Sequence, residues 1–317
     1  GGIGVVIAVT LSVMEVSLSF DNAVVNASVL KNMDEKWRKR FLLWGILIAV
    51  FGMRLLFPVL IVSMATGLGL LDVSIMALND PKEYAHHLQA AHVSIAAFGG
   101  MFLLLVFLSF VLDDAKEVHW LKTIERGLST LGKLESVEIV AAMGVLIVAQ
   151  GLIPEHERLT AVIAGMFGIV LFVLVGSFST LFEERGLERM VNKAATNAGL
   201  MSFIYLEILD ASFSLDGVVG AFAITSDVVI IMIGLAIGAM FVRSLTVFLV
   251  EKGTLEQYIY LEHGAHYAIG ALALLMLASI VYHIPEVVTG LIGVAFILMS
   301  LFSSIINKRM QPASEES

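Results

Sequence analysis

Two short acidic segments of matching pattern lie within long apolar stretches of this chain. Residues 15–22 read EVSLSFDN and residues 210–217 read DASFSLDG. Each segment places two carboxylates six residues apart, and serines occupy the same two positions between them. An ionised side chain at bilayer depth costs several kcal/mol, so such residues usually serve a function and face a partner or a water-filled cavity. The four acids Glu15, Asp21, Asp210 and Asp216 therefore predict a functional site inside a membrane.

The composition predicts an all-α integral membrane protein. Of the 317 residues, 58% are hydrophobic and only 15% are charged, and the mean hydropathy is +0.93. Several apolar runs reach the roughly 20 residues that a membrane-spanning helix needs, while an open sheet would leave backbone groups unsatisfied in lipid. Cysteine is absent, which excludes disulfides and thiolate metal sites. The net charge of −9 comes without a basic patch, so the expected partner is the lipid bilayer and not nucleic acid.

The hydropathy pattern predicts about nine transmembrane helices. They cover residues 4–30, 41–66, 91–112, 137–153, 159–182, 201–224, 229–250, 264–283 and 287–306. Nine crossings place fifteen Lys and Arg residues on one side and two, Lys82 and Arg158, on the other. The positive-inside rule then puts the C-terminus in the cytoplasm and residue 1 outside. Because residue 1 is Gly and not Met, we also expect an upstream signal-anchor or further helix.

The likeness of the two acidic segments extends into the helix that follows each of them. Gly45, Ala49 and Arg54 match Gly234, Gly238 and Arg243 with a single offset. Because five crossings separate the two copies, they run in opposite directions, as an inverted-topology repeat does. Transporters built from such repeats bind substrate near the bilayer midplane.

This repeat divides the chain into four parts. They are residues 1–112, the first three-helix repeat; 113–198, a connecting segment with two membrane helices and surface helices; 199–283, the second, inverted repeat; and 284–317, the last membrane helix and a disordered tail. The third helix of each repeat carries a histidine, His92 or His266. These histidines are either polar side chains at helix ends, or ligands or members of a proton relay.

The spacing of the acids raises a geometric question. On a regular helix Glu15, Ser19, Asn22 and Asn26 share one stripe, and Asp21 lies roughly 120° away. The second copy repeats this arrangement. Either each helix is unwound near its serines, where hydroxyls can satisfy the freed backbone groups, or the two faces serve different partners. We favour the local break.

The charges within the predicted membrane spans favour a cationic ligand. The four acids exceed Arg54 and Arg243 by two negative charges, and Glu207 adds a third. Such an excess suits a divalent cation or two protons. Carboxylate, amide and hydroxyl oxygens are hard ligands that suit Mn²⁺, Mg²⁺ or Ca²⁺. The residues expected to support or gate the site are Ser19, Asn26, Arg54, His92, Glu207, Ser214, Arg243 and His266.

The segments SFDNAVVNA (19–27) and SLDGVVGA (214–221) resemble the signature of the TerC superfamily. These bacterial integral membrane proteins are named from tellurium resistance and grouped with LysE-type exporters, and the chain is most similar to the branch long catalogued as a domain of unknown function. The resemblance implies an inverted repeat, the bacterial plasma membrane and Mn²⁺ efflux. It also implies that Glu15, Asp21, Asn22, Asp210 and Asp216 line the cation site. Gly217 stands where the first copy has Asn22, so the site is asymmetric.

These observations favour a secondary transporter that exports a divalent cation, with Mn²⁺ as the first candidate and protons as the counter-ion. We expect no enzymatic activity and no resident cofactor, and no phosphate-binding loop of an ATPase occurs. The structural alternative is two buried ion pairs made by Arg54 and Arg243. A second alternative is a membrane scaffold of a tellurite- or metal-resistance or metal-delivery complex, docked through segments 113–136 and 183–198. An intramembrane aspartyl protease is disfavoured because its Tyr-Asp and Gly-x-Gly-Asp motifs are missing around Asp21 and Asp216. A homo-oligomer is left open.

Overall fold

The computed structural model describes residues 2–134, 136–186 and 191–310. It also describes the side chains of these residues except 178–186, 191–198, 215, 216, 219, 223 and 286. The described part of the chain is helical throughout and contains no β-strand. The predicted all-α class is therefore confirmed for these residues.

Among the described residues, the first half of the chain contains eight α-helices and one π-helix. They are α1 (Gly2–Leu18), α2 (Phe20–Leu30), α3 (Glu35–Leu47), the π-helix η1 (Ile48–Leu56), α4 (Phe57–Thr66), α5 (Leu70–Asn79), α6 (Pro81–Ala90), α7 (His92–Leu112) and α8 (Lys122–Leu131). The second half contains α9 (Val137–Gln150), α10 (Glu155–Gly186), α11 (Val191–Ile224), α12 (Val228–Glu251), α13 (Thr254–Gln257), α14 (Leu261–Ser279) and α15 (Glu286–Met310).

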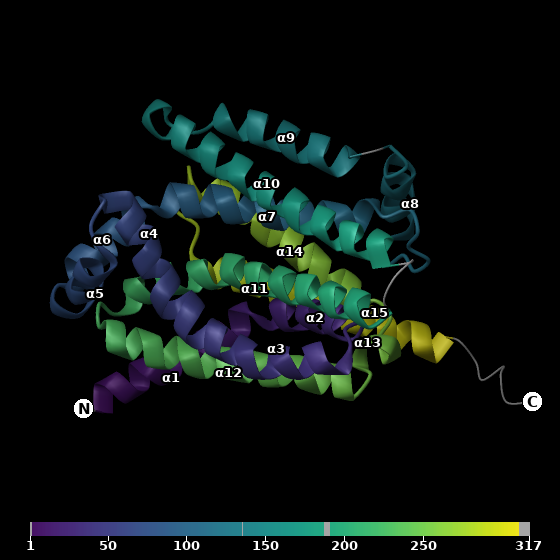
Figure 1. The fold of residues 1–317 in the computed structure, drawn as a ribbon, viewed down its shortest axis with the longest axis horizontal. Coiled ribbons are helices and arrows are strands. Elements are labelled where there is room, and N and C mark those ends of the chain that lie inside the picture. The colour runs from purple at the N-terminus through teal and green to yellow at the C-terminus, as the bar shows by residue number, and fades with distance from the viewer. Residues whose placement is uncertain (1, 135, 187–190, 311–317) are drawn as a thin grey trace, which may run out of the picture.

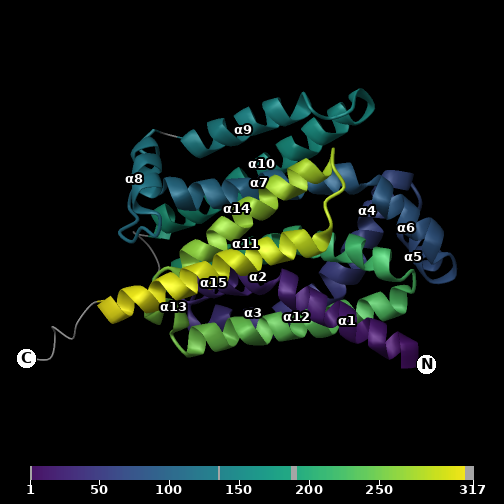
Figure 2. The ribbon, with the colours of Figure 1, turned by 180° about the vertical axis from the view of Figure 1, so that it is seen from behind.

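The long helices run roughly side by side and form a bundle with two distinct ends (Figure 1). The short helices α8 and α13 lie at the end where α15 finishes, and α5 and α6 lie at the opposite end with the start of α1. Figure 2 shows the same arrangement from behind. Helix α2 is the most enclosed element, since it contacts α11, α12, α14 and α15 and nine of its eleven residues are buried.

The described residues contain six helices that are long and apolar enough to cross a membrane, or seven if the bent pair α1–α2 counts as one span. A multi-pass membrane protein is therefore confirmed, whereas nine crossings remain a prediction. Helix α9 covers only 14 residues, fewer than the roughly 20 that a full span requires. Helix α11 carries Glu207, Asp210 and Asp216 in its apolar part, which lowers its hydropathy.

The predicted helix break is confirmed in the first acidic segment and is wrong in the second. Helices α1 and α2 meet at Ser19 with a bend of 52°, whereas α11 continues without interruption through the second segment. In the first copy the Asp21 carboxylate accepts the Asn22 N–H at 3.0 Å, so a side chain replaces a lost helical bond. In the second copy the Ser212 hydroxyl donates to the Ile208 carbonyl within the intact helix.

Two further predictions concern segments at the edges of the described part. The surface segment predicted at 183–198 is mostly taken up by two long helices, because α10 continues to Gly186 and α11 begins at Val191. The tail predicted to be disordered, 311–317, lies outside the described residues.

One irregularity was not predicted: α3 and α4 are joined by the π-helix η1, a rare element that often marks functional sites.

The packing of α1 on α12 depends on Gly234. A β-carbon at this position would lie 2.7 Å from the Leu11 β-carbon and 2.9 Å from the Ala8 carbonyl oxygen. The backbone of α1 cannot move away without losing its packing on α12. The two helices therefore approach this closely only because position 234 has no side chain.

We therefore expect Gly234→Val to lower the stability of the folded protein by about 1–3 kcal/mol, the usual cost of overpacking. Thermal unfolding in detergent measures this change. Gly144→Val is the matched control, since a β-carbon at Gly144 would meet nothing within 4 Å. Equal melting temperatures for the two variants would contradict the role assigned to Gly234.

Candidate acidic site

The bend at Ser19 brings Asp21 to the start of α2. Asp21 occupies the first turn of that helix, where the unpaired N–H groups and the helix dipole stabilise a negative charge. Its side chain is only 5% exposed, and among the described residues it forms no ion pair. The break thus places a carboxylate without a basic partner inside the bundle.

Glu15, on the last turn of α1, has a basic partner. Its carboxylate is 3% exposed and forms a short ion pair with the Arg54 guanidinium from η1. The Ser19 hydroxyl donates a second, longer hydrogen bond to Glu15, at 3.4 Å. Arg54 is held in turn by its own helix, because its Nη1 donates to the Ala49 carbonyl at 2.7 Å. The π-helix therefore carries the residue that neutralises Glu15.

Asp210, on α11, is the centre of a second group of polar side chains. Its carboxylate accepts hydrogen bonds from Asn22 Nδ2 at 2.6 Å and Asn26 Nδ2 at 3.4 Å. The Arg243 guanidinium of α12 pairs with it at 3.0 Å and also donates to the Gly45 carbonyl at 3.1 Å. This centre joins α2, α3, α11 and α12, so residues of both predicted repeats hold one carboxylate.

Glu207 lies one turn before Asp210 and is poorly neutralised. Its nearer oxygen is 3.8 Å from Arg243 Nη2, and neither oxygen has a hydrogen-bond partner in the described part of the chain. A β-carbon at Gly45 would lie 2.9 Å from the Glu207 Oε1 atom, so glycine makes room for this carboxylate. Arg243 is therefore shared between two acids and packs against the Phe41 ring at 3.9 Å.

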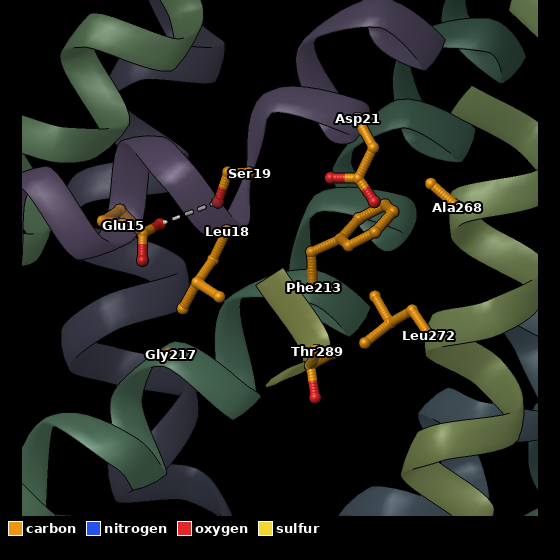
Figure 3. Close-up of a pocket in the computed structure, with 9 residues that line it drawn as sticks. All are labelled: Glu15, Leu18, Ser19, Asp21, Phe213, Gly217, Ala268, Leu272 and Thr289. Atoms are coloured by element: carbon orange, nitrogen blue, oxygen red, sulfur yellow. Dashed lines mark hydrogen bonds between the residues drawn. The ribbon is translucent and has the colours of Figure 1, made fainter. Parts of the chain in front are cut away.

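A small cavity of about 40 Å³ separates Glu15 from Asp21 (Figure 3). Its walls are formed by Glu15, Leu18, Ser19, Asp21, Phe213, Gly217, Ala268, Leu272 and Thr289. This volume admits roughly three water molecules, at about 10–15 Å³ for each, and therefore also a partly hydrated ion. A β-carbon at Gly217 would lie 2.8 Å from Glu15 Oε2. The glycine that replaces asparagine in the second copy thus leaves space for the acid of the first.

The predicted ligands are divided between these two neighbourhoods. Glu15 and Asp21 line the cavity, while Asn22 joins Asp210 in the second centre. The Asp216 side chain lies outside the described residues, and the Ser214 hydroxyl is buried without a partner among them. Within the described part no three His, Asp or Glu side chains are close enough to bind one metal ion. A single metal site formed by all five ligands stays a prediction.

The two predicted relay histidines lie apart from the acids. His92, at the start of α7, contacts the Ser279 hydroxyl at the end of α14, at 3.3 Å. His266, near the start of α14, binds the Glu262 carbonyl at 2.8 Å and stacks on Phe110 near the end of α7. Within the described residues, neither histidine bonds to Glu15, Asp21, Glu207 or Asp210. These contacts also show that α7 and α14 are antiparallel.

Comparison with known proteins agrees with a membrane location. A family model described as "Protein of unknown function (DUF475)" matches residues 20–311. The curated "Uncharacterized membrane protein YceF" of Bacillus subtilis (strain 168) is 34% identical over 110 residues, which make up 34% of this chain and 42% of the relative. The chain thus matches less than half of that relative's length. No solved structure matches significantly. The wider resemblance to the TerC superfamily stays a prediction.

The buried pair of Glu15 and Arg54 makes a testable contribution to stability. We expect Arg54→Met to destabilise the protein by about 3–5 kcal/mol, because it leaves a buried carboxylate without its partner. The double variant Glu15→Gln with Arg54→Met should recover most of this loss, since both charges are removed. Unfolding in detergent measures both variants.

The exposed pair of Lys39 and Glu35, 2.7 Å apart on α3, provides the control. Lys39→Met should change stability little, because solvent screens that pair. A double variant at Glu15 and Arg54 as unstable as Arg54→Met alone would show that the pair's charge balance is not what the fold requires.

Proposed function

Because the chain belongs to the DUF475 family, whose description names no activity, we propose a function from its buried acids: a secondary transporter that exports a divalent cation across the bacterial plasma membrane. Mn²⁺ is the first candidate. The observation that carries this proposal is Asp21, a buried carboxylate without an ion-pair partner among the described residues, facing a cavity that Glu15 also lines. A buried charge of this kind is costly unless it is protonated or meets a cation.

The chemistry of the cavity supports a hard cation. Glu15 and Asp21 offer carboxylate oxygens, and Ser19 and Thr289 offer hydroxyls in the same lining. Oxygen donors of these types suit Mn²⁺, Mg²⁺ and Ca²⁺. Glu207, the second poorly neutralised acid, supplies a further group that can take up a proton.

The ion pairs support an inverted repeat as the framework of transport. The sequence match sets Glu15 against Asp210 and Arg54 against Arg243, and each acid pairs with the arginine of its own repeat. The antiparallel helices α7 and α14 begin near the matched histidines, as oppositely directed copies would. The cation site then lies where the two halves meet.

We infer a role for the arginines as internal counter-ions. In the arrangement described here, Arg54 and Arg243 neutralise Glu15 and Asp210. A cation that binds these carboxylates takes over the positive charge, and the guanidiniums withdraw. When the cation leaves, the arginines return, and the empty carrier can reorient without uncompensated charge. Protons on Asp21 and Glu207 complete the balance and link export to the return of protons.

We expect Asp21→Asn to abolish Mn²⁺ flux in proteoliposomes, to below about a tenth of the wild-type rate, because the amide cannot supply a charged ligand. Flux is measured for Mn²⁺, Mg²⁺, Ca²⁺ and protons. Asp114→Asn, the same chemical change at an exposed position, should leave flux unchanged. Circular dichroism and elution volume show that both variants are folded.

Two results would overturn the exporter. Wild-type protein that moves none of these cations would favour the membrane scaffold, and the Asp21→Asn variant would then keep its partners. Flux that is unaffected by Asp21→Asn would remove the cavity from the transport path.

The proposed orientation places the C-terminus and the Lys-rich loops in the cytoplasm. Because the chain has no cysteine, single cysteines can be labelled without background. We expect cysteines at Lys36 and Lys133, both exposed, to resist an impermeant thiol reagent added outside cells, and a cysteine at exposed Lys82 to react. The reverse pattern would invert the topology.

A further inference from the structure

A group of titratable side chains outside the acidic site surrounds Glu125 of α8. This carboxylate is 0% exposed, although α8 is a short helix at one end of the bundle (Figure 1). Its Oε2 lies 3.1 Å from Lys116 Nζ and 3.5 Å from ring nitrogens of both His119 and His263. Its Oε1 accepts the Leu121 N–H at 3.1 Å. We call these four side chains, Glu125, Lys116, His119 and His263, the Glu125 cluster.

The Glu125 cluster is built to hold an ionised carboxylate. Burial alone raises the pKa of Glu125, but the Leu121 N–H, His263 and Lys116 outweigh burial and hold this pKa below its ordinary value. The carboxylate is therefore charged at neutral pH. A buried charge that loses its partners is strongly destabilising, so the cluster ties α8 firmly to whatever supplies those partners.

The partners come from the start of α14 and from the segment before α8. His263 lies on the first turn of α14, and its Nε2 also binds the Val118 carbonyl at 2.8 Å. The Tyr267 hydroxyl, one turn further along α14, donates to Glu125 at 3.4 Å. Lys116 lies over the Phe110 ring near the end of α7, at 4.3 Å. The cluster therefore fastens α8 across the neighbouring ends of α7 and α14.

The same stretch of α14 leads directly to the acidic cavity. Ala268 follows Tyr267 in sequence, and Ala268 and Leu272 form part of the cavity wall. The first turn of α14 is also tied to the end of α2, because Glu262 pairs with Lys31 at 3.1 Å. Helix α2 carries Asp21. Contacts at this end of the bundle thus hold two walls of the cavity in place.

We propose that the Glu125 cluster is a latch that holds α8 against the neighbouring ends of α7 and α14 and, through the start of α14, keeps the acidic cavity closed from this end. Release of Glu125 frees the start of α14, and the cavity becomes accessible from the α8 end. The latch rests on the proposed function in one respect: its opening serves the passage of the cation at this end of the bundle. Its geometry and its opening can be tested without any transport.

The test measures how fast a cysteine in the cavity wall reacts. Ala268→Cys supplies the single thiol, since the chain has none of its own, and membrane vesicles of both orientations expose either end to an impermeant maleimide. In the Glu125→Gln background we expect labelling from the α8 end to rise about tenfold or more, because loss of a buried charge partner shifts the opening equilibrium by at least that factor. Glu117→Gln, a change at an exposed acid of the same loop, should leave the rate unchanged.

Hydrogen exchange distinguishes a local latch from a cluster that stabilises the whole fold. In Glu125→Gln, amides of α8 and of the first turns of α14 should lose protection while those of α12 keep it. Adding Lys116→Met should restore part of the protection, because no unpaired ammonium remains. Unchanged labelling of Ala268→Cys, or loss of protection in α12 as well, would overturn the latch. Failure of Mn²⁺ flux in the wild type, with the latch results as expected, would overturn only the proposed function.

Discussion

The rest of the structure is organised around the burial of carboxylates inside an apolar bundle. Glu15, Asp21, Glu207 and Asp210 are enclosed by helices whose remaining residues are chiefly hydrophobic. Removal of a carboxylate from water costs several kcal/mol even after relaxation. The fold therefore brings guanidinium, amide, hydroxyl or backbone N–H groups to three of these acids, Glu15, Asp21 and Asp210, and this requirement explains several departures from regular helix geometry.

Three local features meet this requirement. The bend at Ser19 starts a new helix at Phe20, so that the Asn22 N–H donates to the Asp21 carboxylate. The π-helix η1 carries Arg54, which reaches both Glu15 and its own Ala49 carbonyl. Two glycines leave space for acids, Gly45 beside Glu207 and Gly217 beside Glu15. Each feature would be a defect in an ordinary helical bundle, and each is explained by the charge it accommodates.

The sequence was a good guide to whatever depends on local hydrophobicity and charge. The predicted span 91–112 corresponds to α7 and 229–250 to α12, each within one residue of the helix ends, because the apolar runs define them. Ion pairs made by Arg54 and Arg243 were expected only as the structural alternative to a cation site, and the structure contains them with Glu15 and Asp210. The unbroken α11, the π-helix and the Glu125 cluster did not follow, because they depend on contacts between distant residues. Tyr267, for example, lies 142 positions from its partner Glu125.

The acids differ in how well their charges are neutralised, and this difference bears most directly on function. A structural ion-pair network would leave no carboxylate without a partner, yet among the acids whose side chains are described in the spans, only Glu15 and Asp210 have close guanidiniums. Asp21 and Glu207 are buried without equivalent partners in the described part of the chain. Such groups persist when another charge or a proton joins them during the working cycle. A carrier needs carboxylates that its own protein does not fully neutralise, because a fully neutralised site does not attract a cation.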